Sequence, residues 1–308
     1  MGGYQVVARA RLYMKVLGNG LQFEVEVSGD PQAPAVLLTM GLGMQLTAWP
    51  DTLLQALRDA GYRVICYDNR DIGLSTHLDH LGVPNMAWQV IRHRLGWAPK
   101  PPYGLQDMAQ DALGILDALD LRQAHLVGVS MGGMISQRIA ATASERVLSL
   151  TSIMSSSGAP RLPGPRSDVM RALLKRPRSR SPEDVVAHTL EIFRLIGSPA
   201  YPQDMPVFEQ HLMAGARRSY HPEGVARQLM AVVADSGRHS LLDKVSCPTL
   251  VLHGTADPLV PMACGQDTAA RIAGARFTSI EGMGHDWPPG VAVQLAQHIV
   301  PHLKAARA

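Results

Sequence analysis

The chain has 308 residues, of which 46% are hydrophobic and 18% are charged, and its formal net charge at pH 7 is +3. This length and composition suit a globular protein with a sizeable core, and we expect one large α/β domain that carries an insertion. The small net charge does not indicate a nucleic-acid partner, and no apolar run approaches the about 20 residues that span a bilayer.

The N-terminal residues and the cysteines indicate neither a secretory signal nor a disulfide or zinc site. Residues 1–11 contain two arginines and no continuous apolar stretch, so they lack the pattern of a secretory signal, and we expect a cytoplasmic protein. The three cysteines are too few and too scattered for a disulfide framework, and no Cys/His spacing indicates zinc. We therefore expect buried thiols and neither a metal nor a cofactor. No feature of the sequence indicates an oligomeric state.

The first part of the chain predicts strands that alternate with helices. Two strand-like runs, 12–17 and 21–27, are joined by Gly18-Asn19-Gly20, whose residues tolerate the positive φ of a hairpin turn. The pattern then predicts strands at 35–40, 63–67 and 147–154, and helices at 49–60 and 105–119. Such alternation is typical of a parallel sheet with helices on both faces.

The most informative stretch follows a buried strand at 125–129. Gly128-Val129-Ser130-Met131-Gly132 fits the motif G-x-S-x-G, and a helical pattern continues to about residue 143. A serine held in a tight turn with positive φ needs small residues two places before and after it, because larger side chains would collide with neighbouring backbone. We therefore predict Ser130 as a nucleophile, and the N–H of Met131 as one donor to an oxyanion.

Between residues 155 and 240 the sequence becomes rich in Pro, Arg, Ser and Met, with helical fragments at 169–174, 182–196 and 222–234. Strand patterns return at 249–253 and 276–280, and a last helix is predicted at 291–303. We interpret residues 155–240 as an inserted helical cap, and residues 1–154 and 241–308 as one α/β core. The locally basic segment 161–180 is either a solvated face of this cap or a surface that attracts anionic substrates.

Two polar side chains follow the last two predicted strands, where ligand sites of open α/β sheets are found. Asp257 comes after the strand 249–253, and His285 follows the strand 276–280 in a glycine-containing loop. A histidine can take the proton of a serine hydroxyl, and an aspartate can fix the tautomer of that histidine. Two other aspartates, Asp235 and Asp267, lack this placement after a strand, and Asp286 is adjacent to His285 and points away from it by backbone geometry. We therefore predict a triad of Ser130, His285 and Asp257.

The second oxyanion donor is expected in the loop after the strand 35–40. Gly41-Leu42-Gly43 allows backbone amides to approach a substrate, and we choose the Leu42 N–H, with the amides of Gly43 or Met44 as alternatives. In the polar loop at 68–75 we expect Arg70 and Asp71 to order the chain by charge-assisted hydrogen bonds rather than to act in catalysis.

These motifs together resemble the α/β-hydrolase superfamily over nearly the whole chain, and most closely its aclacinomycin methylesterase-like carboxylesterases. The resemblance implies an eight-stranded, mostly parallel sheet, an inserted helical cap and hydrolysis through an acyl-serine intermediate. It also supports Leu42 and Met131 as amide donors. The chain departs from the common His-Gly before the oxyanion residue, because it has Met40-Gly41, as the methylesterase-like branch does.

The leading hypothesis is a cofactor-free serine hydrolase whose partner is a small-molecule carboxylic ester. A second hypothesis is a cofactor-free perhydrolase or haloperoxidase, which uses the same triad. A third, from a different class, is a ligand-binding protein that keeps the hydrolase fold without the chemistry. The presence of all three triad residues in the chain counts against the third hypothesis.

Overall fold

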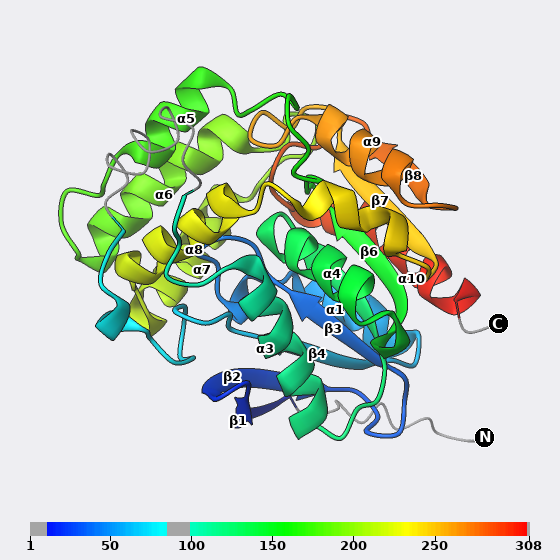
Figure 1. The fold of residues 1–308 in the computed structure, drawn as a ribbon. Coiled ribbons are helices and arrows are strands. Elements are labelled where there is room, and N and C mark those ends of the chain that lie inside the picture. Colours follow the sequence, from blue (N-terminus) through cyan, green and yellow to red (C-terminus); the bar gives the residue numbers. More distant parts are fainter. Residues whose placement is uncertain (1–10, 85–98, 307–308) are drawn as a thin grey trace, which may run out of the picture.

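The computed structural model describes residues 11–84 and 99–306. An eight-stranded sheet passes through the molecule in the order β1-β2-β4-β3-β5-β6-β7-β8 (Figure 1). The strands are β1 (Leu12–Gly18), β2 (Leu21–Ser28), β3 (Ala35–Thr39), β4 (Arg63–Tyr67), β5 (Ala124–Val129), β6 (Val147–Ile153), β7 (Thr249–Gly254) and β8 (Arg276–Ile280). From β4 to β8 all neighbours are parallel, whereas β2 is antiparallel to both β1 and β4. The predicted α/β-hydrolase sheet is confirmed.

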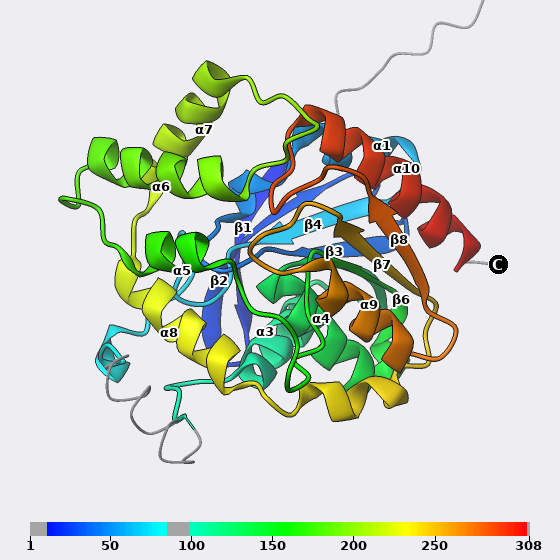
Figure 2. The same ribbon diagram turned by 90° about the horizontal axis from the view of Figure 1, so that it is seen from above.

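Helices cover both faces of this sheet (Figure 2). On one face lie α3 (Leu105–Ala118), α4 (Met131–Thr142) and α9 (Met262–Arg271), and on the other α1 (Asp51–Asp59) and α10 (Pro289–Ala305). Every residue of β3 and β5 is buried. Strands covered on both faces carry continuous apolar runs, and this is why these strands were predictable from the sequence.

The ends of the helices differ from the prediction by a few residues. α1 begins at Asp51 rather than at residue 49, because Pro50 has an extended backbone (φ −63°, ψ 128°) and precedes the first turn. α10 begins at Pro289, two residues before the first apolar residue of the predicted pattern. A proline in the first helical turn needs no N–H partner, so helices start readily there. Short 3₁₀ turns occur at η1 (Leu46–Ala48), η2 (Asp79–Leu81), η3 (Ser144–Arg146) and η4 (Arg238–Lys244).

Residues 155–240, here called the helical segment, connect the paired strands β6 and β7. They form α5 (Ser167–Leu174), α6 (Pro182–Ile196), α7 (Met205–Arg218) and α8 (Pro222–Ala234), which group together beside the sheet in both views (Figures 1 and 2). α7 was not predicted, and the reason is that it buries none of its residues and so lacks a strong apolar stripe. The Asp204 side chain accepts from the Val207 N–H at 3.2 Å, and this N-cap residue was a usable signal.

Two further expectations concern properties outside the fold. In the described part of the chain, no helix combines the length and apolarity needed to cross a bilayer. Cys66 and Cys264 are buried, whereas Cys247 is only partly buried, and all three are free thiols. The expectation of a cytoplasmic protein relied on residues 1–11, of which 1–10 lie outside the described residues.

Candidate active site

Ser130 lies in the turn between β5 and α4. Its backbone has φ 53° and ψ −118°, a conformation that L-residues rarely adopt, and its N–H donates to the carbonyl oxygen of Ile153 at 2.9 Å. A Cβ atom at position 132 would lie 2.0 Å from the carbonyl oxygen of Thr39, and one at position 128 would lie 2.3 Å from that of Gly132. The glycines therefore provide the clearance that the sequence pattern predicted.

The structure brings the three predicted triad side chains together. His285 Nε2 lies 3.1 Å from Ser130 Oγ, and His285 Nδ1 lies 2.7 Å from Asp257 Oδ2. Asp257 follows β7 and His285 follows β8, whose carboxyl ends meet at the same edge of the sheet as that of β5. If Nδ1 carries the proton and donates it to Asp257, Nε2 presents a lone pair to the Ser130 hydroxyl. This geometry permits the serine to lose its proton to the ring.

Asp257 is held in place by several donors. Its Oδ1 accepts from the N–H groups of Leu259 at 2.9 Å and Val260 at 2.8 Å. The fully buried His253, which the sequence analysis did not single out, places Nε2 3.5 Å from Asp257 Oδ2. Burial acts to raise the pKa of Asp257, but the charge of His285 and the hydrogen bonds from His253, His285 and Val260 outweigh burial and lower this pKa well below its usual value. Asp257 is therefore ionised near neutral pH.

The three competing aspartates have other partners. Asp286 accepts from the Ser198 hydroxyl, and Asp267 pairs with Arg271. Asp235 forms ion pairs with the arginines at 138 and 238. Among the described residues, none of the three hydrogen-bonds to the ring of His285. The choice of Asp257 from its place after a strand thus agrees with the contacts of all four aspartates.

The loop after β3 lies against Ser130, since a Cβ atom at Gly41 would be 3.4 Å from the Ser130 Cβ. The Gly43 N–H donates to Gln228 Oε1 at 3.0 Å, and the Met44 N–H donates to the Gly41 carbonyl oxygen at 3.3 Å. Within residues 11–84 and 99–306, the Leu42 N–H has no hydrogen-bond acceptor. Of the three amides considered from the sequence, Leu42 is therefore the one left for a ligand.

The second predicted donor, Met131, is the first residue of α4. The first N–H groups of a helix have no acceptor within the helix, and the helix dipole favours negative charge at that end. The Met131 amide and the Leu42 amide therefore come from two different elements that meet at Ser130. This is the arrangement that an oxyanion hole requires.

Arg70 and Asp71 are both held in buried ion pairs, as predicted for a structural loop. Arg70 donates to Asp111 from Nε at 2.5 Å and from Nη2 at 2.6 Å. Asp71 accepts from Arg227 Nε at 2.8 Å and from Nη2 at 2.7 Å. The expectation that charge-assisted hydrogen bonds order this loop is confirmed. The identity of the partners, Asp111 and Arg227, was not predicted, because they lie far away in the sequence.

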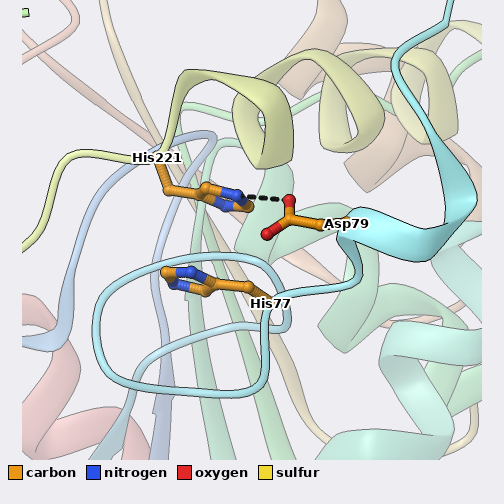
Figure 3. Close-up of side chains that lie close together, drawn as sticks. All are labelled: His77, Asp79 and His221. Atoms are coloured by element: carbon orange, nitrogen blue, oxygen red, sulfur yellow. Dashed lines mark hydrogen bonds and ion pairs between the residues drawn. The ribbon is translucent and has the colours of Figure 1, made fainter.

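One group of potential metal ligands is found in the described ranges. Ligand atoms of His77, Asp79 and His221 lie within 4.8 Å of one another (Figure 3). The two imidazole rings are stacked, with centroids 3.9 Å apart and planes inclined by 3°. Lone pairs in the planes of parallel rings do not converge on one ion, so this arrangement does not fit a metal. Instead, His221 lies 2.8 Å from both the Asp71 carbonyl oxygen and Asp79 Oδ1, and links the start of α8 to the loop after β4.

The basic segment 161–180 is exposed at all seven of its arginine and lysine residues. Arg166 pairs with Asp168, and Arg180 pairs with Glu223. Exposed pairs of this kind contribute little to stability. Attraction of an anionic substrate by this surface stays a prediction.

Comparisons with known proteins agree with this architecture. A family model described as the alpha/beta hydrolase fold matches residues 34–287. Rhodomycin D methylesterase DnrP of Streptomyces peucetius is 31% identical over 299 residues, which cover 90% of this chain and 93% of that protein. 3-Oxoadipate enol-lactonase 2 of Acinetobacter baylyi is 26% identical over 253 residues, which cover 82% of this chain and 82% of that protein. The crystal structure of the enol-lactonase from Burkholderia xenovorans LB400 superposes with a TM-score of 0.72 at 22% identity, covering 94% of this chain and 100% of that one.

Proposed function

Because the chain belongs to the α/β-hydrolase fold family and matches its methylesterase-like branch, we propose that it hydrolyses carboxylic esters through an acyl-serine intermediate. The observation that carries this proposal is the hydrogen-bonded series from Ser130 through His285 to Asp257, with distances of 3.1 Å and 2.7 Å. The amide of Leu42, which has no acceptor among the described residues, supplies a binding position for the oxygen that becomes negative during the reaction.

In the first half of the reaction, Ser130 Oγ attacks the ester carbonyl carbon and His285 Nε2 takes the hydroxyl proton. The carbonyl oxygen becomes an oxyanion that accepts hydrogen bonds from the amides of Leu42 and Met131. When the carbon–oxygen bond to the alcohol breaks, His285 returns the proton to the departing alcohol oxygen. The products of this half are a free alcohol and an ester between the acyl group and Ser130.

In the second half, a water molecule takes the place of the alcohol. His285 accepts one proton of the water, and the hydroxide oxygen attacks the acyl carbon. Collapse of the second oxyanion breaks the bond to Ser130, which regains its proton from His285. Asp257 stays ionised throughout and stabilises the charged imidazole, because the pKa of this carboxyl is held low.

For the substrate, we propose a small molecule that carries an ester of a carboxylic acid, with methyl esters as the first class to assay. The proposal is supported by relatives named rhodomycin D methylesterase and 3-oxoadipate enol-lactonase, which are named for bonds of the ester type. We also propose that the helical segment 155–240 is the cap that encloses this substrate. Its helices α7 and α8 contact the loops that follow β3 and β4, and the first of these loops lies against Ser130.

Replacement of Ser130 tests the proposal directly. We expect Ser130→Ala to lower turnover of p-nitrophenyl acetate by about 10³-fold or more, and to abolish the burst of p-nitrophenol, because no acyl-enzyme forms. Ser136→Ala is a matched control, since Ser136 is a buried serine of α4, the helix that follows Ser130, and its hydroxyl has no hydrogen-bond partner in the described structure. Unchanged turnover in Ser130→Ala would refute the mechanism.

Two measurements separate the alternative hypotheses. A fluorophosphonate probe should label the wild type and not Ser130→Ala, and failure to label the wild type would favour a non-catalytic ligand-binding protein. Formation of peracetic acid from acetate and hydrogen peroxide, at a rate above that of ester hydrolysis, would favour the perhydrolase. We expect ester hydrolysis to be the faster of the two reactions.

A further inference from the structure

Gln228 of α8 connects the helical segment to the loop that carries Leu42. Its side chain is fully buried. Oε1 accepts from the Gly43 N–H at 3.0 Å, and Nε2 donates to the Arg70 carbonyl oxygen at 2.8 Å. One side-chain amide therefore satisfies a backbone donor after β3 and a backbone acceptor after β4.

The loop that Gln228 contacts has little rigidity of its own. Gly41 and Gly43 flank Leu42, and Gly43 has φ +70°. Glycine has more accessible backbone conformations than any other residue, so a loop with two glycines is costly to fix in one conformation. An oxyanion donor is effective only when it is already oriented before the reaction. The orientation of the Leu42 amide therefore depends on contacts from outside the loop.

Those outside contacts come largely from the helical segment. Gln45 Nε2 donates to the carbonyl oxygens of Gly215 at 2.7 Å and Ser219 at 2.9 Å, at the end of α7. On the core side, Asn69 Nδ2 donates to the Met40 carbonyl oxygen at 3.0 Å. Gln228 is the contact nearest to Leu42, because it binds the amide of the next residue along the chain.

Helix α8 is itself fixed to the core. Arg227, next to Gln228 in the sequence, forms two hydrogen bonds to the carboxylate of Asp71, and both side chains are fully buried. A buried bidentate ion pair has a strict geometry, so it sets the position of α8 relative to the loop after β4. The amide of Gln228 is thereby presented to Gly43 from a rigid support.

We propose that Gln228 is a positioning residue of the oxyanion hole, which holds the loop 41–43 so that the Leu42 N–H faces Ser130. This inference rests on the proposed function, since it requires that Leu42 stabilises an oxyanion. A hydrocarbon side chain at 228 would leave the Gly43 N–H and the Arg70 carbonyl oxygen buried without partners. The loop would then turn toward another acceptor and carry the Leu42 amide away from its position.

The first test compares kcat with KM in Gln228→Leu, with p-nitrophenyl acetate as the substrate. We expect kcat to fall about 10- to 100-fold, less than the 10²–10³-fold loss for a deleted oxyanion donor, while KM changes less than about 3-fold. The matched control is Gln137→Leu. Gln137 is also fully buried with two hydrogen bonds, to Ser152 and from Arg238, and in the described part of the chain it forms no hydrogen bond with the loop. An equal loss of kcat in both variants would overturn the proposal.

The second test uses an alkyl trifluoromethyl ketone, which forms a tetrahedral adduct with a catalytic serine and places an oxyanion where the ester oxygen would be. We expect its inhibition constant to rise in Gln228→Leu by the same factor by which kcat/KM falls. A general loss of stability would not produce this proportionality. An unchanged inhibition constant would contradict the assigned role.

A conservative variant and a hydrogen-exchange measurement test the role of Gln228 further. Gln228→Glu retains an acceptor oxygen for the Gly43 N–H, and we expect its kcat to exceed that of Gln228→Leu, or of Gln228→Met if the leucine variant does not fold. In the wild type, the Gly43 amide should exchange with deuterium slowly, and free exchange would overturn the proposal. If Ser130→Ala is inactive while Gln228→Leu equals the wild type, only this inference fails and the proposed function stands.

Discussion

The sheet and the helical segment 155–240 are stabilised in different ways. In the sheet, strands such as β3 and β5 have every residue buried, and their side chains fill two continuous apolar clusters. In the helical segment, α7 buries none of its residues, and α5 buries only Val169 and Ala172. The segment is attached to the core through α8, by the apolar Ala231 and by polar side chains such as Arg227 on Asp71 and Gln228 on Gly43.

The sheet and the helical segment are therefore held in position by different kinds of interaction. The burial of apolar side chains does not require a particular direction of contact. Apolar strands that alternate with helices along the chain are therefore sufficient to form the sheet. A buried ion pair or amide contact has a strict geometry and a high cost when one partner is missing. The attachment of the helical segment therefore depends in part on individual polar residues, and one of them, Gln228, contacts the loop that lies against Ser130.

The largest expected effect on stability comes from the ion pair between α8 and the core. Arg227→Met leaves the Asp71 carboxylate buried without its cation, and we expect the free energy of unfolding to fall by about 3–5 kcal/mol. Urea denaturation measures this loss. The size of the effect would show that one polar contact matters as much as a large core side chain.

The double variant Asp71→Asn/Arg227→Met is the control for this interpretation. It removes both charges, and asparagine tolerates the positive φ of 68° at position 71. We expect it to recover part of the stability that the single variant loses. A double variant that is less stable than Arg227→Met would show that the loss arises from packing rather than from an unpaired charge.

A smaller loss in the free energy of unfolding is expected for a large-to-small substitution in the sheet. Leu126 of β5 is fully buried, and Leu126→Ala should lower the free energy of unfolding by about 3 kcal/mol because it leaves a cavity. In α7, Val207 is 51% exposed, and Val207→Ala should change the same quantity by less than about 0.5 kcal/mol. Similar losses at both positions in urea denaturation would contradict the contrast between the two regions.

The smallest expected effect is a pH dependence of the free energy of unfolding, which arises from a histidine in the core. Burial lowers the pKa of His302 in α10 below its ordinary value of 6.5, and its Nε2 lies 3.2 Å from the Leu150 carbonyl oxygen. Below pH 6.5 the unfolded chain takes up this proton more readily than the folded chain does, so the folded state loses stability as the pH falls.

We expect His302→Gln to remove part of this dependence, up to about 1.4 kcal/mol for each pH unit below 6.5. The free energy of unfolding should be measured in urea at several pH values between 5 and 8 for both proteins. Parallel curves for the wild type and the variant would show that His302 does not contribute. The comparison reports on the core, because His302 is a buried residue of α10 whose ring faces the Leu150 carbonyl oxygen of β6.

Much of the core and the site was predictable because their signals are local. The strand before Ser130, the flanking glycines and the helix after them occupy one short stretch, and the structure shows the positive φ that this pattern requires. Asp257 and His285 were found from their places after predicted strands. The boundaries of α1 and α10 were less accurate, because prolines at their ends displace the helix from its apolar pattern.

The partners of polar side chains were not predictable. Gln228 and Gly43 are separated by 185 positions, and Arg227 and Asp71 by 156. No periodicity links such residues, and a glutamine or arginine on a helix is most often exposed to solvent. The sequence analysis chose the Leu42 amide and kept those of Gly43 and Met44 as alternatives, and the acceptors that the structure gives to Gly43 and Met44 could not be foreseen.

The sequence by itself determined the fold class and the three side chains of the proposed triad, because both are encoded in apolar periodicity and in short motifs at strand ends. The tertiary structure decided how the helical segment is attached and which amide in the loop after β3 has no acceptor among the residues that the structure describes. The physical reason is that a hydrogen bond between distant residues exists only once the sheet has brought their backbones within about 3 Å of each other.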